Sequence, residues 1–200
     1  MNRPNTWLWF LGLLLVIQAI LLWIDHHPMF FFGDSESYIQ TAISGWLPTD
    51  RSFVYGYFIR LVAVTTKSLT SLAVIQTMLS WITSVVTAHL LIRYFRVRQW
   101  IAFAASIMTS IEPLHLLYAR YVMTETLALT IFVFYVWFSL QYLEAPRIKW
   151  LFFAHSIAVV MISVRLAFIP LIWICALALP IFAFPAIATQ ARLIGAKATA

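Results

Sequence analysis

The chain is dominated by apolar stretches, several of them long enough for a helix to cross a lipid bilayer. A transmembrane helix needs roughly 20 consecutive apolar residues. Such stretches alternate with short turns that carry charges and prolines, and they cover residues 7–24, 72–92, 100–111, 122–143, 150–163 and 166–184. Glu112 and Pro113 break or kink the third stretch, which continues towards residue 118. The sequence therefore predicts an all-α, polytopic membrane protein with about six transmembrane helices.

The composition supports the same class. Hydrophobic residues make up 63% of the chain and charged residues 10%, whereas a soluble domain carries about 25% charge. The net charge of +6 is typical of basic cytoplasmic turns, so no nucleic-acid partner is expected. The lone Cys175 forms no internal disulfide and belongs to no zinc-binding spacing. Arg3 precedes an apolar helix without a small-residue cleavage site, which indicates a retained signal anchor.

Residues 25–71 decide the predicted topology, because the apolar segment 52–66 is short and contains Arg60. If this segment lies on the membrane surface, six spans place one set of basic residues on a single side, which is then cytoplasmic. That set is Arg3, Arg93, Arg96, Arg98, Arg147, Lys149, Arg192 and Lys197. If the segment spans the bilayer, Arg3 and the 93–98 cluster fall on opposite sides. We therefore favour the surface interpretation: a transmembrane module over 1–184 with a cytoplasmic N-terminus, juxtamembrane helices in a first external loop at 25–71, and a cytoplasmic tail at 185–200.

This topology leaves an unusual set of ionisable residues on the external side. The external acids are Asp25, Asp34, Glu36, Asp50, Glu112 and Glu125. The external basic residues, against the positive-inside rule, are Arg51, Arg60, Lys67, Arg120 and Arg165. Arginines placed against the topological preference, beside carboxylates near the membrane, suggest a phosphate-binding site.

The segment 33–38, Gly-Asp-Ser-Glu-Ser-Tyr, holds the strongest catalytic candidate. Asp34 is predicted to be a general base that takes a proton from an acceptor hydroxyl. The structural alternative is that Asp34 or Ser35 caps a short helix over 36–44. Glu36 is two residues further on and does not share the helical face of Asp34, so Glu36 and Tyr38 are secondary candidates for substrate binding.

Three further positions have both a functional and a structural interpretation. Glu125 would bind a sugar or orient an arginine, with Arg120 on phosphate, or the two would form an exposed pair at a helix start. Arg165 interrupts a long apolar stretch, and it would bind a lipid phosphate or extend its charged group towards water at the turn between two helices. Arg51 would neutralise phosphate or pair with the adjacent Asp50.

The sequence assigns no cofactor. His26, His27 and His115, with nearby acids, keep a divalent metal ion open as an alternative. Their spacing matches no zinc pattern, so no residue is assigned as a metal ligand. His89 and His155 are expected to be hydrogen-bonded histidines near the cytoplasmic end.

The order of short motifs resembles the GT-C superfamily of polyprenyl-phosphate-dependent glycosyltransferases, in the branch of protein O-mannosyltransferases and aminoarabinose transferases. The motifs are Gly-Asp-Ser-x-x-Tyr-x-x-x-Ala at 33–42, an aromatic segment at 53–58, Met-Thr-Glu-Thr-Leu at 123–127 and Ser-Val-Arg at 163–165. Relatives tend to have a Tyr-Pro pair in the aromatic segment, and this chain lacks the proline. Family members are also much longer, with further helices.

The resemblance implies a membrane glycosyltransferase of the plasma (inner) membrane, with its active face periplasmic. The enzyme would move a sugar from a polyprenyl-phosphate donor to a hydroxyl on a lipid, glycan or protein acceptor. Asp34 would be the catalytic base, and Arg51, Arg120 and Arg165 would contact phosphate. Because the chain is shorter than the family, three alternatives stay open: a non-catalytic membrane subunit, a lipid-carrier-binding or flippase-like protein, and an inactive truncated transferase.

Overall fold

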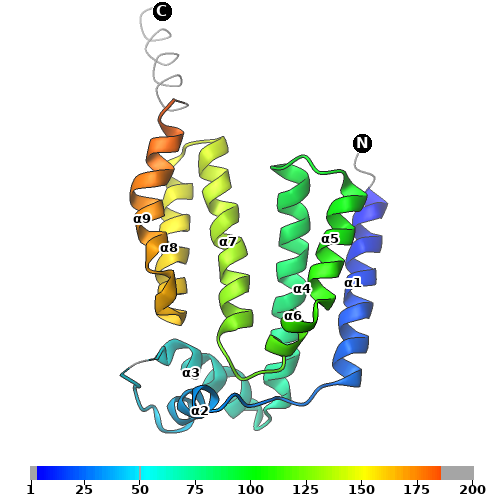
Figure 1. Cartoon of the computed structure of the whole chain (residues 1–200), viewed down its shortest axis with the longest axis vertical. Helices are drawn as coiled ribbons and strands as arrows, with labels where there is room; N and C mark the ends of the chain where they lie inside the picture. The colour runs from blue at the N-terminus through cyan, green and yellow to red at the C-terminus, as the bar shows by residue number, and fades with distance from the viewer. Residues whose placement is uncertain (1–3, 50, 186–200) are drawn as a thin grey trace, which may run out of the picture.

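The computed structural model describes residues 4–49 and 51–185, and over these residues the chain folds into helices joined by short connections. The long helices run side by side as columns, and shorter helices lie across one end (Figure 1). The elements in chain order are α1 (Pro4–Ile24), α2 (Asp34–Ser44), α3 (Phe53–Ile59), η1 (Arg60–Val64), α4 (Thr70–Arg93), α5 (Gln99–Ile111), α6 (Pro113–Tyr118), α7 (Glu125–Glu144), α8 (Ile148–Val164), η2 (Leu166–Phe168), α9 (Pro170–Trp173) and η3 (Ile174–Ala178).

Within the described ranges, four helices are long and apolar enough to cross a membrane: Asn5–Ile24, Thr70–Arg93, Glu125–Glu144 and Leu166–Pro185. The other two columns are shorter, with 13 residues in α5 and 17 in α8. At 1.5 Å per residue, they are roughly 20 and 26 Å long, against about 30 Å of hydrocarbon. The predicted all-helical membrane class is therefore confirmed, while length supports four of the six predicted spans.

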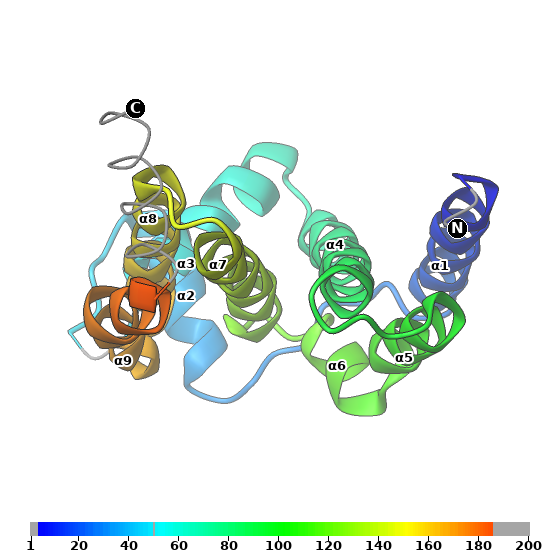
Figure 2. The ribbon, with the colours of Figure 1, turned by 90° about the horizontal axis from the view of Figure 1, so that it is seen from above.

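The columns form an elongated row when seen from above, with α8 and α9 at one side and α1 at the other (Figure 2). In the middle of the row α7 packs on both α8 and α4, and α4 packs on α5 and α1.

The two ends of the bundle differ in chemistry. We call the end with α2, α3 and the connections 25–33, 112–124 and 165–169 the site end. We call the end with the turns 94–98 and 145–147 the basic end.

The basic end carries the turns that the topology argument placed in the cytoplasm. Arg93 at the end of α4 forms an exposed 2.6 Å ion pair with Glu144 at the end of α7. Arg96, in the turn between α4 and α5, has a positive φ of 53°. Of the tail predicted at 185–200, only Pro185 is described, at the end of the last helix. Arg3, Arg192 and Lys197 also lie outside the described residues.

The face of α4 that is buried in the bundle is polar. It carries Gln76, Thr77, Ser80, Thr83 and Ser84, each at most 5% exposed. Ser80 hydrogen-bonds His115 of α6 at 2.6 Å, and Thr83 hydrogen-bonds Thr130 of α7 at 2.9 Å. Helices in lipid associate through small residues and interhelical hydrogen bonds, since the lipid offers no hydrophobic penalty to exposed apolar side chains. This polar face explains why α4 occupies the centre of the row.

At the site end, α2 and α3 pack against each other beneath the columns (Figure 1). Their contact is tight, because a Cβ on Gly56 would lie 2.5 Å from Cβ and Cγ2 of Thr41. Gly33 before α2 and Gly45 after it have left-handed φ values of 81° and 76°, which glycine adopts without the penalty of a side chain. These glycines allow the chain to turn sharply into and out of α2.

Candidate functional site

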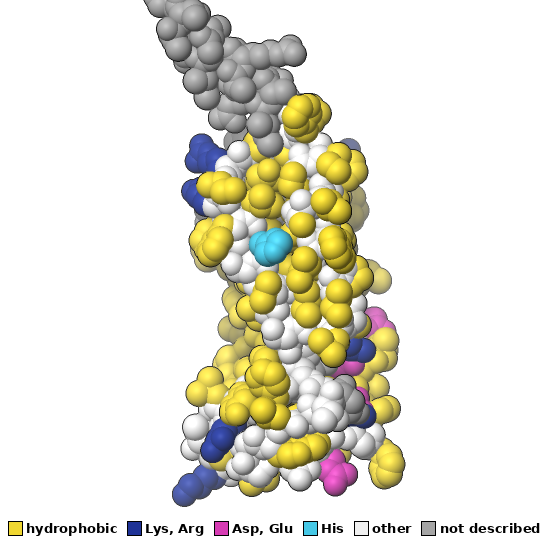
Figure 3. Space-filling model, turned by 90° about the vertical axis from the view of Figure 1, so that its left-hand side faces the viewer, with side chains coloured by type: hydrophobic (Ala, Val, Ile, Leu, Met, Phe, Trp, Pro, Cys, Tyr) yellow, Lys and Arg dark blue, Asp and Glu magenta, His cyan; other side chains and the backbone are white. Residues whose placement is uncertain are grey.

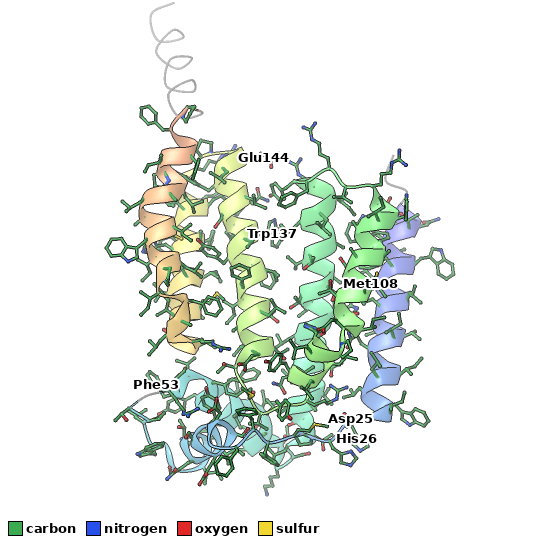
Figure 4. The ribbon with its side chains drawn as sticks, in the orientation of Figure 1. Asp25, His26, Phe53, Met108, Trp137 and Glu144 are labelled. Atoms are coloured by element: carbon green, nitrogen blue, oxygen red, sulfur yellow. The ribbon has the colours of Figure 1, made fainter. Side chains whose placement is uncertain are left out.

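Among the described residues, two acid–arginine pairs at the site end are joined by side-chain hydrogen bonds, and the helix starts place their carboxylates; a third contact, Arg120 with Asp25, is longer at 3.9 Å. Asp34 is the first residue of α2, and Glu125 is the first residue of α7. A carboxylate at a helix N-terminus is favoured by the helix dipole. Figure 4 shows the side chains of this end, with Phe53, Asp25 and His26 labelled around it.

In the first pair, an amino group of the Arg51 guanidinium donates a hydrogen bond to Oδ1 of Asp34. The two side chains are 29% and 28% exposed, so water and ligands can reach them. The alternative that Asp34 or Ser35 caps α2 is wrong: the cap position is Gly33, and no side chain caps the helix there. The alternative partner of Arg51, Asp50, lies outside the described residues.

In the second pair, Nη1 of Arg165 donates to Oε1 of Glu125 at 2.6 Å. Glu125 is only 17% exposed and Arg165 is 44% exposed. Arg165 has extended backbone angles at the end of α8, which separates α8 from the following turn. The other carboxylate oxygen of Glu125, Oε2, is buried and has no hydrogen-bond partner among the described residues.

A cavity of about 270 Å³ adjoins the second pair. Its polar lining consists of Glu125, Arg165, His115, Tyr118 and Thr126, and the apolar side chains of Ala128, Leu129, Phe132 and Phe168 complete the wall. The hydroxyl of Thr126 is buried and, like Oε2 of Glu125, has no described hydrogen-bond partner. Unsatisfied buried polar atoms beside an open cavity are atoms that a ligand or water can satisfy.

Hydrogen bonds that flank the two pairs bring them to the same place. Ser52, next to Arg51, donates its hydroxyl proton to the carbonyl oxygen of Ser163, two residues before Arg165. Ser35, next to Asp34, donates to the carbonyl oxygen of Val122 at 2.9 Å. Val122 in turn is three residues before Glu125. The neighbours of the first pair are therefore bonded to the neighbours of the second.

Two buried tyrosines support this arrangement. The rings of Tyr38 and Tyr55 meet edge to face at 5.0 Å. Gln76 of α4 donates to the Tyr55 hydroxyl at 3.1 Å and to the Tyr121 carbonyl at 3.0 Å. Burial raises the pKa of Tyr55 well above its ordinary value, and the negative charge of nearby Glu125 contributes to the shift. Tyr38 is only 7% exposed, so its place is in the support of the site, away from solvent.

Arg120 is not part of either pair. Its side chain is only 5% exposed. Its Nε donates to the carbonyl oxygen of Asp25, and its Nη1 donates to Oγ1 of Thr77 at 2.9 Å. Burial lowers the pKa of Arg120, and the Asp25 carboxylate, 3.9 Å away, partly opposes that shift. The described contacts of Arg120 thus hold the connection after α1 against α4.

The remaining candidates lie apart from the pairs. Glu36 is exposed and borders a separate groove of about 640 Å³ beside Phe30, Phe31 and Phe32. The rings of His26 and His27 lie 4.2 Å apart, whereas His115 bonds Ser80 inside the bundle. Over the part of the chain that the structure describes, no three His, Cys, Asp or Glu side chains gather as metal ligands would.

Sequence reasoning did not identify Ser35, Ser52, Tyr55, Gln76 or Thr126 as parts of the site. Gln76 carried a usable signal, because an amide inside an apolar span needs a hydrogen-bond partner in the protein. The two serines carried none, since serine is common in connections and helix starts. No family model, curated protein or solved structure matches this chain.

Proposed function

We propose that the chain is a membrane glycosyltransferase that uses a polyprenyl-phosphate sugar as donor. The observation that carries the proposal is the pairing at one end of a membrane bundle: Asp34 with Arg51 and Glu125 with Arg165, joined through the bonds of Ser35 and Ser52. Two guanidinium groups suit the recognition of a phosphate, because their planar donors match its oxygens. The adjoining cavity, with unsatisfied oxygens on Glu125 and Thr126, offers hydrogen bonds to a sugar.

The proposed step is a single displacement. The hydroxyl oxygen of the acceptor attacks the anomeric carbon and forms the new glycosidic bond. The bond from that carbon to the phosphate oxygen breaks, and its electron pair leaves on the polyprenyl phosphate. Asp34 accepts the hydroxyl proton as general base, while Arg165 and Arg51 stabilise the negative charge on the leaving phosphate. Attack opposite the leaving group inverts the configuration at the anomeric carbon.

The ion pairs give donor binding a specific role before the step. With no donor bound, Arg51 is bonded to Asp34, and a guanidinium bonded to a carboxylate competes with any proton that the carboxylate would accept. A donor phosphate competes for Arg51 and leaves an oxygen of Asp34 to accept the proton. Glu125 stays with Arg165 and orients it, and its buried Oε2 accepts from a sugar hydroxyl once the cavity wall opens on donor binding.

Release of polyprenyl phosphate tests the proposal. The full chain in proteoliposomes is given a panel of radiolabelled polyprenyl-phosphate sugars with glycan, lipid or water as acceptor. Asp34→Asn should abolish release while donor binding persists, and Arg51→Gln with Arg165→Gln should lose binding. Arg93→Gln, which breaks an ion pair of the same 2.6 Å length at the basic end, should change neither.

Two results would contradict the enzyme interpretation. Turnover that survives in Asp34→Asn would remove the general base. Donor binding without turnover in the native chain, insensitive to Asp34 and lost with Arg165, would instead identify a non-catalytic lipid-carrier-binding subunit.

A further inference from the structure

The helix formed by α3 and η1 has an apolar stripe that the described chain leaves 43–71% exposed. Phe53, Tyr57, Leu61 and Val64 are 46%, 43%, 71% and 44% exposed. Their spacing of four, four and three residues places them on one face of a helix. The opposite face is buried against the rest of the site end through Tyr55, Ile59 and Ala63. Four partly exposed apolar side chains on one face of a helix indicate contact with a membrane or a partner.

Two basic residues accompany the stripe. Arg60 follows Ile59 in the middle of the helix, and Lys67 follows its end with a positive φ of 54°. Both side chains are exposed, and neither forms a hydrogen bond or ion pair with a described residue. Nη1 of Arg60 lies 3.8 Å from the position that a Cβ on Gly45 would take, which is van der Waals distance. The helix from Phe53 to Val64 contains no acidic residue.

The orientation of the helix identifies the surface that it meets. The columns run along the long axis of the molecule, and α3 lies across them at the level where they end (Figure 1). The space-filling view of the left-hand side of the molecule shows apolar and basic side chains next to each other at its lower end (Figure 3). A helix with an apolar face and flanking lysine or arginine, parallel to the bilayer, inserts roughly 5–10 Å into the boundary of headgroups and acyl chains.

We infer that the α3–η1 helix lies in the bilayer interface at the site end, with its stripe among acyl chains and with Arg60 and Lys67 on the phosphates of anionic phospholipids. Free phosphate would satisfy the two cations and leave the stripe exposed to water, so the lipid surface fits both features. Because Arg51 and Ser52 directly precede this helix, lipid contact would also fix the height of the Asp34–Arg51 pair above the acyl chains.

Fluorescence quenching tests the depth of the stripe in the full chain, reconstituted in vesicles with Cys175→Ala to remove the native thiol. A fluorophore on Leu61→Cys or Val64→Cys should be quenched by lipids brominated near the headgroup end of the acyl chain, and protected from aqueous iodide. The matched control is Ser68→Cys, in the exposed turn before α4, which should show the reverse pattern. The proposal would be overturned if iodide quenched the Leu61 and Val64 probes as strongly as the Ser68 probe. Protection of the Leu61 and Val64 probes from both quenchers would also overturn it, because that result would indicate a protein partner on the stripe.

The lipid class is tested with headgroup spin labels on phosphatidylglycerol or phosphatidylcholine at equal mole fraction. The anionic label should quench the Leu61 probe more strongly in the native background. Arg60→Gln with Lys67→Gln should lower the relative affinity for the anionic lipid by about thirtyfold, from about fivefold for each basic residue near a lipid surface. Arg96→Gln with Arg98→Gln removes the same charge at the basic end and should leave the preference intact. Equal quenching by both labels in the native chain, or an unchanged preference in the Arg60 and Lys67 variant, would refute the lipid contact of these cations.

Discussion

Arg120 offers the sharpest test of which arginines have a structural role and which bind phosphate. The sequence places Arg120 beside Glu125 as a phosphate ligand, whereas the structure buries its side chain to 5% exposure and bonds it to Asp25 and Thr77. Under the structural interpretation, Arg120→Met removes the two hydrogen bonds by which this charged donor links the connection before α7 to the residue after α1 and to α4. It should therefore impair folding before it impairs any binding step.

The magnitude follows from those bonds. Hydrogen bonds to a charged group contribute about 1.5–3 kcal/mol each, which gives about 3–6 kcal/mol for the pair. Methionine offsets part of this loss, because the guanidinium is no longer buried and the remaining Asp25 side chain is 41% exposed and hydrated. We expect a net loss of about 2–4 kcal/mol in the free energy of unfolding.

Equilibrium unfolding in mixed micelles, followed by the fluorescence of the nine tryptophans, measures this loss. Arg93→Met is the matched control, because its ion pair is 55% and 42% exposed and should contribute less than about 1 kcal/mol. Thr77→Val should lose about 1 kcal/mol, and its effect should be smaller in the Arg120→Met background. If Arg120→Met unfolds like the native chain and only donor binding is lost, Arg120 is a phosphate ligand and its structural role is refuted.

Two further predictions concern the support of the site. Gly56→Ala should destabilise the chain by about 1–3 kcal/mol through overpacking, because its Cβ would lie 2.5 Å from Thr41. The control Gly12→Ala, whose Cβ would have nothing within 4 Å, should not destabilise the chain. Equal unfolding midpoints for the two variants would contradict the tight packing at Gly56. Burial raises the pKa of Tyr55, so the folded chain keeps this proton while the unfolded chain loses it near pH 10. This contribution to stability is present below pH 10 and decreases above it; Tyr55→Phe should flatten that decrease in unfolding experiments from pH 9 to 11, and an unchanged slope would exclude Tyr55 as its source.

The fold class was predictable from sequence for a simple reason: runs such as 72–92 and 122–143 have the length and apolarity that a membrane span requires. The break at Glu112 and Pro113 was predictable as well, and the structure adds that Glu112 accepts from the backbone N–H of His115 at 2.7 Å. Short helices were harder to assign. Helix α5 runs alongside the long helices of the bundle, although its 13 residues are too few to cross the hydrocarbon of a bilayer.

The pairing of the site could not be read from the sequence. Separation along the chain favours Arg120 as the partner of Glu125 and Asp50 as the partner of Arg51. The structure instead pairs Glu125 with Arg165, 40 residues away. It also joins Arg51 to Asp34, 17 residues away, while Asp50 lies outside the described residues. Those pairings depend on contacts between distant segments, such as the bond from Ser52 to the Ser163 carbonyl, which no local pattern of residues encodes.

The short backbone pairing between Met29 and Tyr121 also bears on how the protein is made. Met29 donates to the Arg120 carbonyl at 2.8 Å, and Val122 donates to the Met29 carbonyl at 2.9 Å. These bonds join segments that leave the ribosome far apart in time, with α2, α3, α4 and α5 synthesised between them. Until Val122 emerges, residues 29–35 lack the backbone partners of Met29 and Ser35, although α2 can already pack on α3. A nascent chain stalled before α7 should therefore expose this segment to proteases, and protection should appear only after the second half of the chain has entered the membrane.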